Sequence, residues 1–325
     1  MGWFGAILLL TAALQVTVLL LSPFYKLKWP FSWYYIRIFK PLLQDDQRYR
    51  WKFYLVPCFY ISLYGYILYV LVQQVLPTIQ SRLWLIEKVV IIPILLLSTP
   101  ILGLLSMLIP PETTTNHSPG SPDQYEPDGI IYHPGTICRT CHLTKPARSK
   151  HCNICQACIL VADHHCIWVN NCIGKGNYVY FFAFLIANVT SLSYGFLRVL
   201  QISITSPNLH SRSTIIFMIL CGTFAVICGV FTALQLQLVN DGMTTNEKDK
   251  WFTIQQFMKE QSLVKTPESQ WFIRSAHNPT KFFSTNAYDN KAYTLKNYKL
   301  IRDPSQIPNV YDHGSCWQNL KRLCT

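Results

Sequence analysis

Long apolar runs alternate with polar, basic connectors along this chain. Five runs are about 20 residues long, which is the length that a helix needs to cross the hydrocarbon core of a bilayer. One such run could be a buried core helix, but five in one chain indicate an all-α integral membrane protein with about five transmembrane helices. The runs lie near Trp3–Leu21, Phe53–Leu76, Val89–Ile109, Tyr178–Leu197 and Ser213–Val239.

The first run could instead be a cleavable signal peptide. It lacks a basic n-region, and no clear small-x-small cleavage site precedes Pro23. We therefore expect this helix to be retained.

Lys and Arg residues are distributed unevenly over the connectors, and this asymmetry predicts the orientation of the helices. The loop 22–52, the central segment and the tail after Val239 are rich in basic residues. We expect these segments in the cytosol and the N-terminus in the lumen. In this orientation the sequon Asn116-His117-Ser118 faces the cytosol and stays unglycosylated.

Composition agrees with a membrane protein. Half of the residues are hydrophobic and 14% are charged, whereas soluble domains carry about 25% charged residues. The net charge of +12 is explained by attraction of the cytosolic segments to the anionic surface of a lipid bilayer, so no nucleic-acid partner is needed. A transporter would carry ionisable residues inside its helices; few are present, and Arg198 lies near enough to a helix end to snorkel.

The pattern divides the chain into four parts. Residues 1–110 would hold helices one to three with a basic cytosolic loop, 111–177 a linker and a small cysteine-rich domain, 178–240 helices four and five, and 241–325 a cytosolic tail. Within the tail, apolar residues at helical spacing predict a short helix, either at the membrane interface or packed on the cytosolic domain. We expect the end of the tail to be loosely ordered.

Seven of the twelve cysteines lie between Cys138 and Cys172. Closely spaced cysteine pairs with histidines supply the ligands that tetrahedral zinc prefers. Disulfides are the alternative, but the odd number and the reducing cytosolic side favour zinc. Two closed zinc sites need eight ligands. Six cysteines with two histidines would supply them and leave one thiol free, and seven cysteines with one histidine would leave none.

The run Asp163-His164-His165-Cys166 is the second chemical signal. A carboxylate and an imidazole beside a thiol form the arrangement that activates a cysteine nucleophile. The same two residues could instead support a zinc ligand from outside the coordination shell. The spacing alone leaves both interpretations open.

The run from Cys138 to Cys172 closely resembles the DHHC cysteine-rich domain of protein S-acyltransferases, and it lies between two predicted membrane helices as in that family. Further likenesses are the TTxE-like run Thr244-Thr245-Asn246-Glu247 and, more weakly, the Asn/aromatic run Asn286-Ala287-Tyr288-Asp289-Asn290. Two departures are Ile167, where most members have Pro, and the lack of a recognisable Asp-Pro-Gly motif after the preceding helix. The whole chain is similar to the fungal endoplasmic-reticulum branch of the family, which palmitoylates SNARE proteins.

This resemblance implies a role for each residue of the cluster. Cys166 would be the nucleophile, with His164 as its base, Asp163 orienting His164 and Thr245 in contact with Asp163. The two structural zinc ions would have interleaved ligand sets, the first formed by Cys138, Cys141, His151 and Cys158, and the second by Cys152, Cys155, His165 and Cys172.

The resemblance also implies a palmitoyltransferase activity, with palmitoyl-CoA as the acyl donor. Trp168 would wall the site or anchor it at the interface, and Arg148 and Lys150 would meet CoA phosphates or form a solvated basic face. Acceptors would be membrane proteins with juxtamembrane cysteines, such as SNAREs, and the enzyme would be a multi-pass protein of the endoplasmic reticulum membrane with a cytosolic active site. The rival is a membrane-anchored zinc module that binds partners, which would need no free cysteine.

Overall fold

The computed structural model describes residues 11–40 with gaps at 12–13, 16, 19–20, 23 and 26, and then residues 47–116, 125–206, 208 and 211–324. The chain divides into two units, Met1–Phe59 and Tyr60–Thr325. The first predicted span, Trp3–Leu21, falls largely on residues outside the described part. The described elements of the first unit are short helical segments: α2 (Phe31–Tyr34), η1 (Tyr35–Phe39) and η2 (Gln47–Tyr54).

Four helical spans in the described part of the chain are long and apolar enough to cross a membrane. They cover Arg50–Arg82, Glu87–Leu108, Tyr178–Thr205 and Arg212–Asn240. They coincide with the second to fifth predicted runs, so the predicted helical membrane architecture is confirmed. Their elements are α4 (Leu55–Val70), η3 (Leu71–Val75), α5 (Leu76–Ile79), η4 (Gln80–Arg82), η5 (Glu87–Ile91), α6 (Ile92–Leu108), α7 (Tyr178–Thr205) and α8 (Arg212–Asn240).

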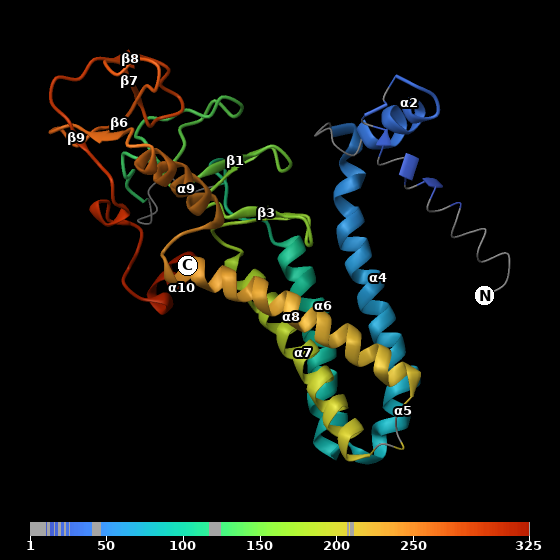
Figure 1. Ribbon diagram of the computed structural model, residues 1–325. Coiled ribbons are helices and arrows are strands. Elements are labelled where there is room, and N and C mark those ends of the chain that lie inside the picture. The colour runs from blue at the N-terminus through green and yellow to red at the C-terminus, as the bar shows by residue number, and fades with distance from the viewer. Residues whose placement is uncertain are drawn as a thin grey trace. The chain divides into compact units, whose positions relative to one another are not determined.

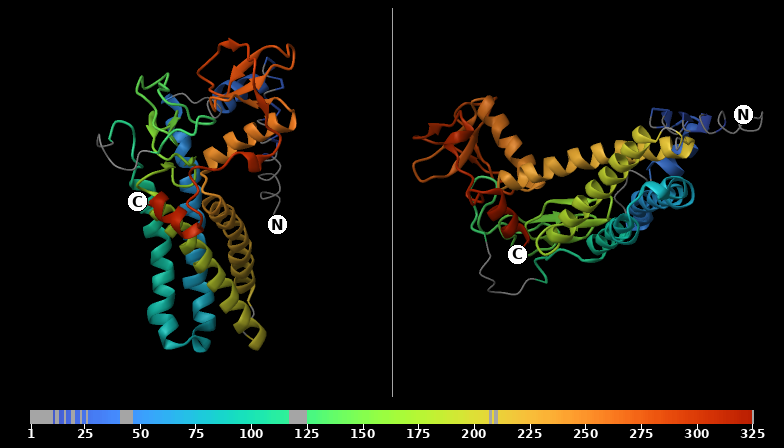
Figure 2. Two further views of the ribbon diagram at one scale, coloured as in Figure 1. Left: turned by 90° about the vertical axis from the view of Figure 1, so that its left-hand side faces the viewer. Right: turned by 90° about the horizontal axis from the view of Figure 1, so that it is seen from below.

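The helices of the second unit pack side by side (Figures 1 and 2). One apolar cluster joins Val75 and Ile79 to Val199 and Phe217, which lie on α7 and α8. Arg198 does not snorkel: its Nε donates to Glu87 Oε1 at 2.6 Å. Because the two charges meet between α7 and η5, the pair fastens these two helices together.

The cysteine-rich segment, between α6 and α7, lies at one end of the helices, together with the segments after α8. The end of α5 and the start of α6 lie at the opposite end (Figures 1 and 2). The cysteine-rich segment contains two antiparallel hairpins, formed by β1 (Lys150–Cys152), β2 (Ala157–Ile159), β3 (His164–Cys166) and β4 (Asn171–Ile173).

The tail after α8 is folded, so the prediction of a loosely ordered end is wrong. Helix α9 (Thr245–Lys259) buries Ile254 and Met258 against Leu263 and Trp271, as in the second of the two alternatives for this segment. A five-stranded antiparallel sheet follows, in the order β8-β7-β6-β5-β9, and the chain ends in a helix. The elements are β5 (Leu263–Lys265), β6 (Trp271–Arg274), β7 (Phe282–Ser284), β8 (Ala292–Tyr293), β9 (Lys299–Leu300), η7 (Pro304–Gln306) and α10 (Cys316–Cys324).

Candidate functional site

The two small hairpins bring histidine and cysteine side chains together in pairs. In the first, His151 stands opposite Cys158, and in the second, His165 stands opposite Cys172. Successive side chains of a strand point to opposite faces. Cys152 directly follows His151, so its side chain points to the opposite face and belongs to the other cluster. The two ligand sets are therefore interleaved along the chain.

Two tight cysteine turns complete the clusters. The backbone N–H of Cys141 lies 3.4 Å from Cys138 Sγ, and the N–H of Cys155 lies 3.4 Å from Cys152 Sγ. These N–H groups favour thiolate over thiol, because they donate to the charged sulfur. In each turn the first sulfur therefore accepts an N–H bond that stabilises its charged form.

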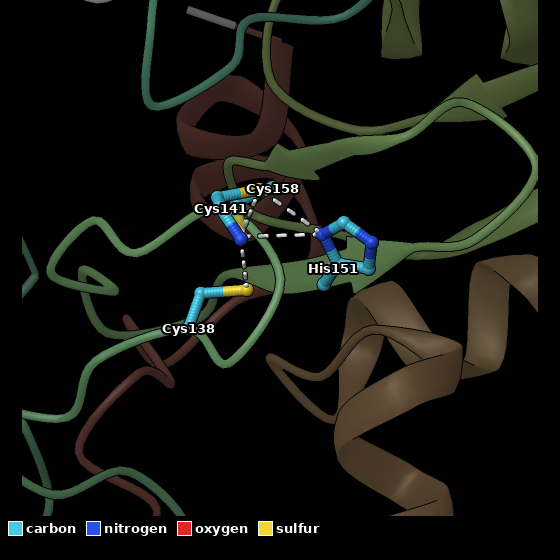
Figure 3. Close-up of side chains that lie close together, drawn as sticks. All are labelled: Cys138, Cys141, His151 and Cys158. Atoms are coloured by element: carbon cyan, nitrogen blue, oxygen red, sulfur yellow. Dashed lines mark hydrogen bonds between the residues drawn. The ribbon is translucent and has the colours of Figure 1, made fainter.

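The described residues contain two groups of four possible metal ligands, and in each group the ligand atoms all lie within 4.8 Å of one another. They are the two sets implied by the family resemblance: Cys138, Cys141, His151 and Cys158 (Figure 3), and Cys152, Cys155, His165 and Cys172.

The spacing of the ligand atoms fits tetrahedral zinc. With Zn–S at about 2.3 Å and Zn–N at about 2.0 Å, a tetrahedral site places two sulfurs about 3.8 Å apart and sulfur about 3.5 Å from nitrogen. In the first cluster Cys141 Sγ lies 3.8 Å from Cys158 Sγ and 3.2 Å from His151 Nδ1. In the second, Cys155 Sγ lies 3.5 Å from both Cys172 Sγ and His165 Nδ1. Both clusters can hold a metal ion.

Cys166 belongs to neither cluster. It is 5% exposed and packs in an apolar cluster with Phe181 and Val239, where the hairpin meets the adjacent ends of α7 and α8. Two residues before it, His164 donates through Nδ1 to Asp163 Oδ2 at 2.6 Å. Burial opposes protonation of His164, but hydrogen bonds to Asp163 and Cys166 raise its pKa to about 10. The thiol thus faces an imidazole whose charged form is stabilised from both sides.

Helix α9 fixes the carboxylate of this arrangement. Asp163 is 3% exposed, and its Oδ1 accepts a hydrogen bond from the backbone N–H of Thr245, the first residue of α9. A carboxylate at a helix N-terminus is stabilised by unpaired N–H groups and by the helix dipole. The expected contact of Thr245 with Asp163 is therefore made by the backbone.

The assignment of Arg148 to CoA phosphates has to be corrected. Arg148 is 2% exposed, and its Nε and Nη2 donate to the two carboxylate oxygens of Glu247 at 2.6 and 2.7 Å. Its guanidinium lies 4.7 and 4.8 Å from the ring centres of Tyr125 and Tyr311. The guanidinium is therefore neither a surface contact for phosphate nor part of a solvated basic face, because it is buried and paired with Glu247. Glu247 also accepts from the backbone N–H of Thr244, so the pair ties the cysteine-rich segment to the capping box of α9.

The other two residues predicted near the acyl donor, Lys150 and Trp168, lie on the surface. Lys150 is exposed, and Trp168 is 45% exposed next to Ile167, which is 51% exposed. Nearly half of the Trp168 side chain is thus accessible from the surface, whereas Cys166 is buried.

Sequence reasoning missed two buried asparagines that dock the cysteine-rich segment on α6. Asn171 Nδ2 donates to the carbonyl of Ile109 at 2.8 Å, and Asn177 Nδ2 donates to the same carbonyl at 3.1 Å and to that of Cys172 at 2.8 Å. Asn171 belongs to the pair Asn170-Asn171, which the resemblance to the DHHC domain includes without giving it a role. Asn177 precedes α7, where an asparagine reads as an ordinary helix cap.

Comparison with known proteins agrees with this geometry. Residues 131–251 match the family model described as DHHC palmitoyltransferase. The chain is 48% identical to Palmitoyltransferase SWF1 of Saccharomyces cerevisiae, over 95% of this chain and 96% of that protein. It is 42% identical to Palmitoyltransferase SWF1 of Candida glabrata, over 95% and 96% of the two chains, and 40% identical to that of Kluyveromyces lactis, over 96% of each.

Proposed function

Because the chain belongs to the DHHC palmitoyltransferase family and is a protein S-palmitoyltransferase of multi-pass membrane type, we propose that Cys166 carries the acyl group. One observation supports this proposal above the others. Six of the seven cysteines in the segment gather with two histidines in metal-ligand clusters, while Cys166 lies outside them beside the His164–Asp163 pair.

The reaction then proceeds in two thioester exchanges. The Cys166 thiolate attacks the thioester carbonyl of palmitoyl-CoA, the new C–S bond forms, and CoA leaves as its thiolate, which takes up a proton. An acceptor cysteine next attacks the acyl-Cys166 carbonyl and regenerates the Cys166 thiolate. His164 is protonated beside the Cys166 thiolate and gives its proton to the leaving CoA thiolate. The neutral imidazole then removes the proton from the acceptor thiol, and Asp163 keeps the ring in position.

The two metal clusters have a structural role in this proposal. Zinc bound there would supply folding free energy to a segment with few apolar residues of its own. The residues of this chain perform the proton transfer and the nucleophilic attack. We retain the division of the chain into four parts at residues 110, 177 and 240, in which the proposed catalytic segment lies between two helical parts.

The donor would approach from the cytosolic surface. Lys150 is exposed and is the remaining candidate, among the residues singled out from the sequence, for contact with CoA phosphates. Trp168 borders the site where an acyl chain enters the helices. Burial of that chain is favourable by about 0.8 kcal/mol per CH2 group.

Acceptors would be membrane proteins, because Cys166 lies where α7 begins. Only thiols close to the bilayer reach such a nucleophile, so we propose juxtamembrane cysteines of proteins such as SNAREs as substrates. By similarity we place the enzyme in the endoplasmic reticulum membrane, with its active site in the cytosol.

A direct test uses purified enzyme and labelled palmitoyl-CoA. We expect label on the wild-type chain, release of that label by neutral hydroxylamine, and no label on Cys166→Ser. Cys58→Ser, which alters an exposed thiol outside the cysteine-rich segment, is the matched control and should label as the wild type does. Label on Cys166→Ser at the wild-type yield would remove Cys166 as the acyl carrier.

A further inference from the structure

A buried amide lies among apolar residues near the end of α8. Gln235 is 7% exposed, whereas the side chain of Gln237, two positions later, is exposed. Gln235 precedes Asn240, the last residue of α8, by five positions, or about 7.5 Å along the helix axis. Because residues four apart share a face of a helix, Gln235 lies on the same side as Val239, which packs in the apolar cluster that contains Cys166. The buried amide is therefore on the face of α8 that borders the proposed active site.

The partner of this amide is the first residue of α9. Gln235 Nε2 donates to Thr245 Oγ1 at 3.5 Å, and this is the one side-chain hydrogen bond that Gln235 makes with the residues that the structure describes. Because a buried amide without a partner is costly, the contact gives the side chain a defined direction. It bridges the turn 241–244 and joins the end of α8 directly to the start of α9.

Thr245 is also the residue that holds Asp163. The backbone N–H of Thr245 donates to Asp163 Oδ1, while Oδ2 of the same carboxylate accepts from His164 Nδ1 at 2.6 Å. A continuous series of hydrogen bonds therefore runs from Gln235 through Thr245 and Asp163 to His164, beside Cys166.

Aromatic contacts give α8 a second route to the imidazole. The ring of Phe231, one turn before Gln235, lies 6.5 Å from the ring of Phe181, and the ring of Phe181 lies 5.6 Å from that of His164. Packing of this kind limits where the imidazole can be, but it does not direct a carboxylate. The hydrogen bonds through Thr245 are the contacts of α8 that bear on the direction of Asp163.

We propose that Gln235 is a positioning residue for acyl transfer, which holds Thr245 so that the Thr245 N–H stays directed at Asp163. This inference rests on the proposed roles of Asp163, His164 and Cys166. Gln235 acts through two other residues and needs no contact with the acyl group. Its loss would let the carboxylate and the imidazole shift, and a misplacement of about 1 Å can slow a reaction by about 10²-fold.

A double-mutant cycle in the full-length enzyme tests the proposal. Gln235→Leu removes the donor, and Thr245→Val removes the accepting oxygen but keeps the backbone N–H that binds Asp163. For each single variant and for the double variant, single-turnover labelling gives the maximal rate of acyl-Cys166 formation and the palmitoyl-CoA concentration at half of that rate. Gln237→Leu, at an exposed glutamine of the same helix, is the matched control. Gln235→His restores an N–H donor, and zinc content reports on the fold of every variant.

We expect each single variant to lower the maximal rate by about 10- to 100-fold and to leave the half-saturating palmitoyl-CoA concentration unchanged. The double variant should be no slower than the slower single variant, because both changes remove the same contact. Gln237→Leu should react as the wild type does, Gln235→His should recover most of the rate, and zinc content should match the wild type throughout.

Three results would overturn the positioning role of Gln235: a wild-type rate for Gln235→Leu, a double variant slowed by the product of the two single effects, or loss of zinc from Gln235→Leu. The last result would show that the amide supports the fold and not the reaction. A wild-type enzyme that forms no acyl-Cys166 would contradict the proposed function and this inference together, so the two failures are distinguishable.

Discussion

At the scale of single residues, adjacent positions of one short strand have different tasks. His165 stands opposite Cys172 in the hairpin and lies in a metal cluster, while the next residue, Cys166, packs in the apolar cluster at the ends of the helices. Because side chains alternate along a strand, the hairpin can present a metal ligand and the proposed nucleophile on opposite faces.

Replacement of His164 tests the proton-transfer role. His164→Ala should slow formation of the acyl-enzyme by about 10²–10⁴-fold, the contribution typical of a positioned acid–base group. Metal content should stay at the wild-type value, since His164 is outside both clusters. Single-turnover labelling with palmitoyl-CoA measures the rate, and His277→Ala, at an exposed position of the tail, should change it less than twofold by this account. A wild-type rate for His164→Ala would exclude the role.

The role of a residue was predictable from the sequence only where that role depends on residues nearby in the chain. The ligand sets and the Asp163–Cys166 run follow a spacing that the resemblance made specific, and the structure brings each set together. Arg148 was misassigned because its partner, Glu247, is far along the chain, and the local sequence shows a basic stretch without showing which member is buried.

At the scale of elements, α9 connects the cysteine-rich segment to the end of α8. The N–H group of Thr245 engages Asp163, which precedes β3, and Glu247 of the capping box engages Arg148, which precedes β1. The Thr244–Glu247 motif therefore has two functions: it starts a helix, and it provides the groups that fix the carboxylate of Asp163, for which we propose a catalytic role.

The buried Arg148–Glu247 pair should be costly to break from one side. Glu247→Gln leaves the guanidinium without a counterion, and such changes cost about 3–5 kcal/mol. We expect a clear fall in the midpoint of thermal unfolding. The control is Lys248→Gln, which breaks the ion pair between Lys248 and Asp241. The side chains of this pair are 51% and 30% exposed, so its loss should cost about 0–1 kcal/mol.

The double variant Arg148→Met/Glu247→Leu gives the complementary test. It removes both charges, so most of the stability should return. If Glu247→Gln unfolded at the same temperature as Lys248→Gln, the buried pair would not be the connection between the two segments.

Gly174 marks a close approach inside the cysteine-rich segment. A Cβ atom there would lie 2.6 Å from Ile159 Cγ2 and 2.8 Å from the backbone oxygen of Leu160. Because backbone cannot move aside cheaply, Gly174→Ala should destabilise this segment by about 1–3 kcal/mol. Gly65→Ala, on α4 with no atom within 4 Å of its Cβ, is the control. Limited proteolysis measures the effect, and equal resistance of the two variants would contradict it.

The helices were predictable because long apolar runs carry a strong signal. Each of the four spans overlaps the expected run, although two of them extend further, to Arg82 and Thr205 instead of Leu76 and Leu197. The fold of the tail was not predictable, because its strands have two to four residues each. A strand of that length is too short to show alternation, and its pairing depends on distant contacts such as Val264 opposite Leu300.

At the scale of the whole molecule, the cysteine-rich segment and the folded tail share one end of the helical bundle (Figure 1). The proposed cytosolic orientation gives this end access to acyl-CoA and to juxtamembrane thiols. It also keeps the cysteines in a reducing compartment, where metal binding is favoured over disulfides.

This orientation predicts that Asn116 carries no glycan. Membranes that contain the native chain should show no shift in electrophoretic mobility after glycosidase treatment, and a secreted glycoprotein from the same cells is the control. A glycan on Asn116 would reverse the orientation and expose the cysteine-rich segment to an oxidising lumen.

The rate at which an acceptor is acylated should also depend on its attachment to the membrane. A fragment with a cysteine beside its transmembrane helix should be acylated in proteoliposomes, and the same fragment without the helix should be acylated far more slowly, because Cys166 lies at the ends of the membrane helices. The rate for each fragment is measured by release of CoA and by labelling of the acceptor. Equal rates for the two fragments would contradict the proposed substrate class.

The central claim is that eight residues bind metal and Cys166 alone carries the acyl group. Metal per chain, measured by elemental analysis beside acyl-enzyme yield, tests it most directly. Cys166→Ser should keep two zinc ions per chain and form no acyl-enzyme, because serine is a far weaker nucleophile. Cys158→Ala should lose metal and become sensitive to protease, since metal binding in a closed site contributes to folding. Loss of zinc from Cys166→Ser to the extent seen for Cys158→Ala would make Cys166 a ligand and contradict the account.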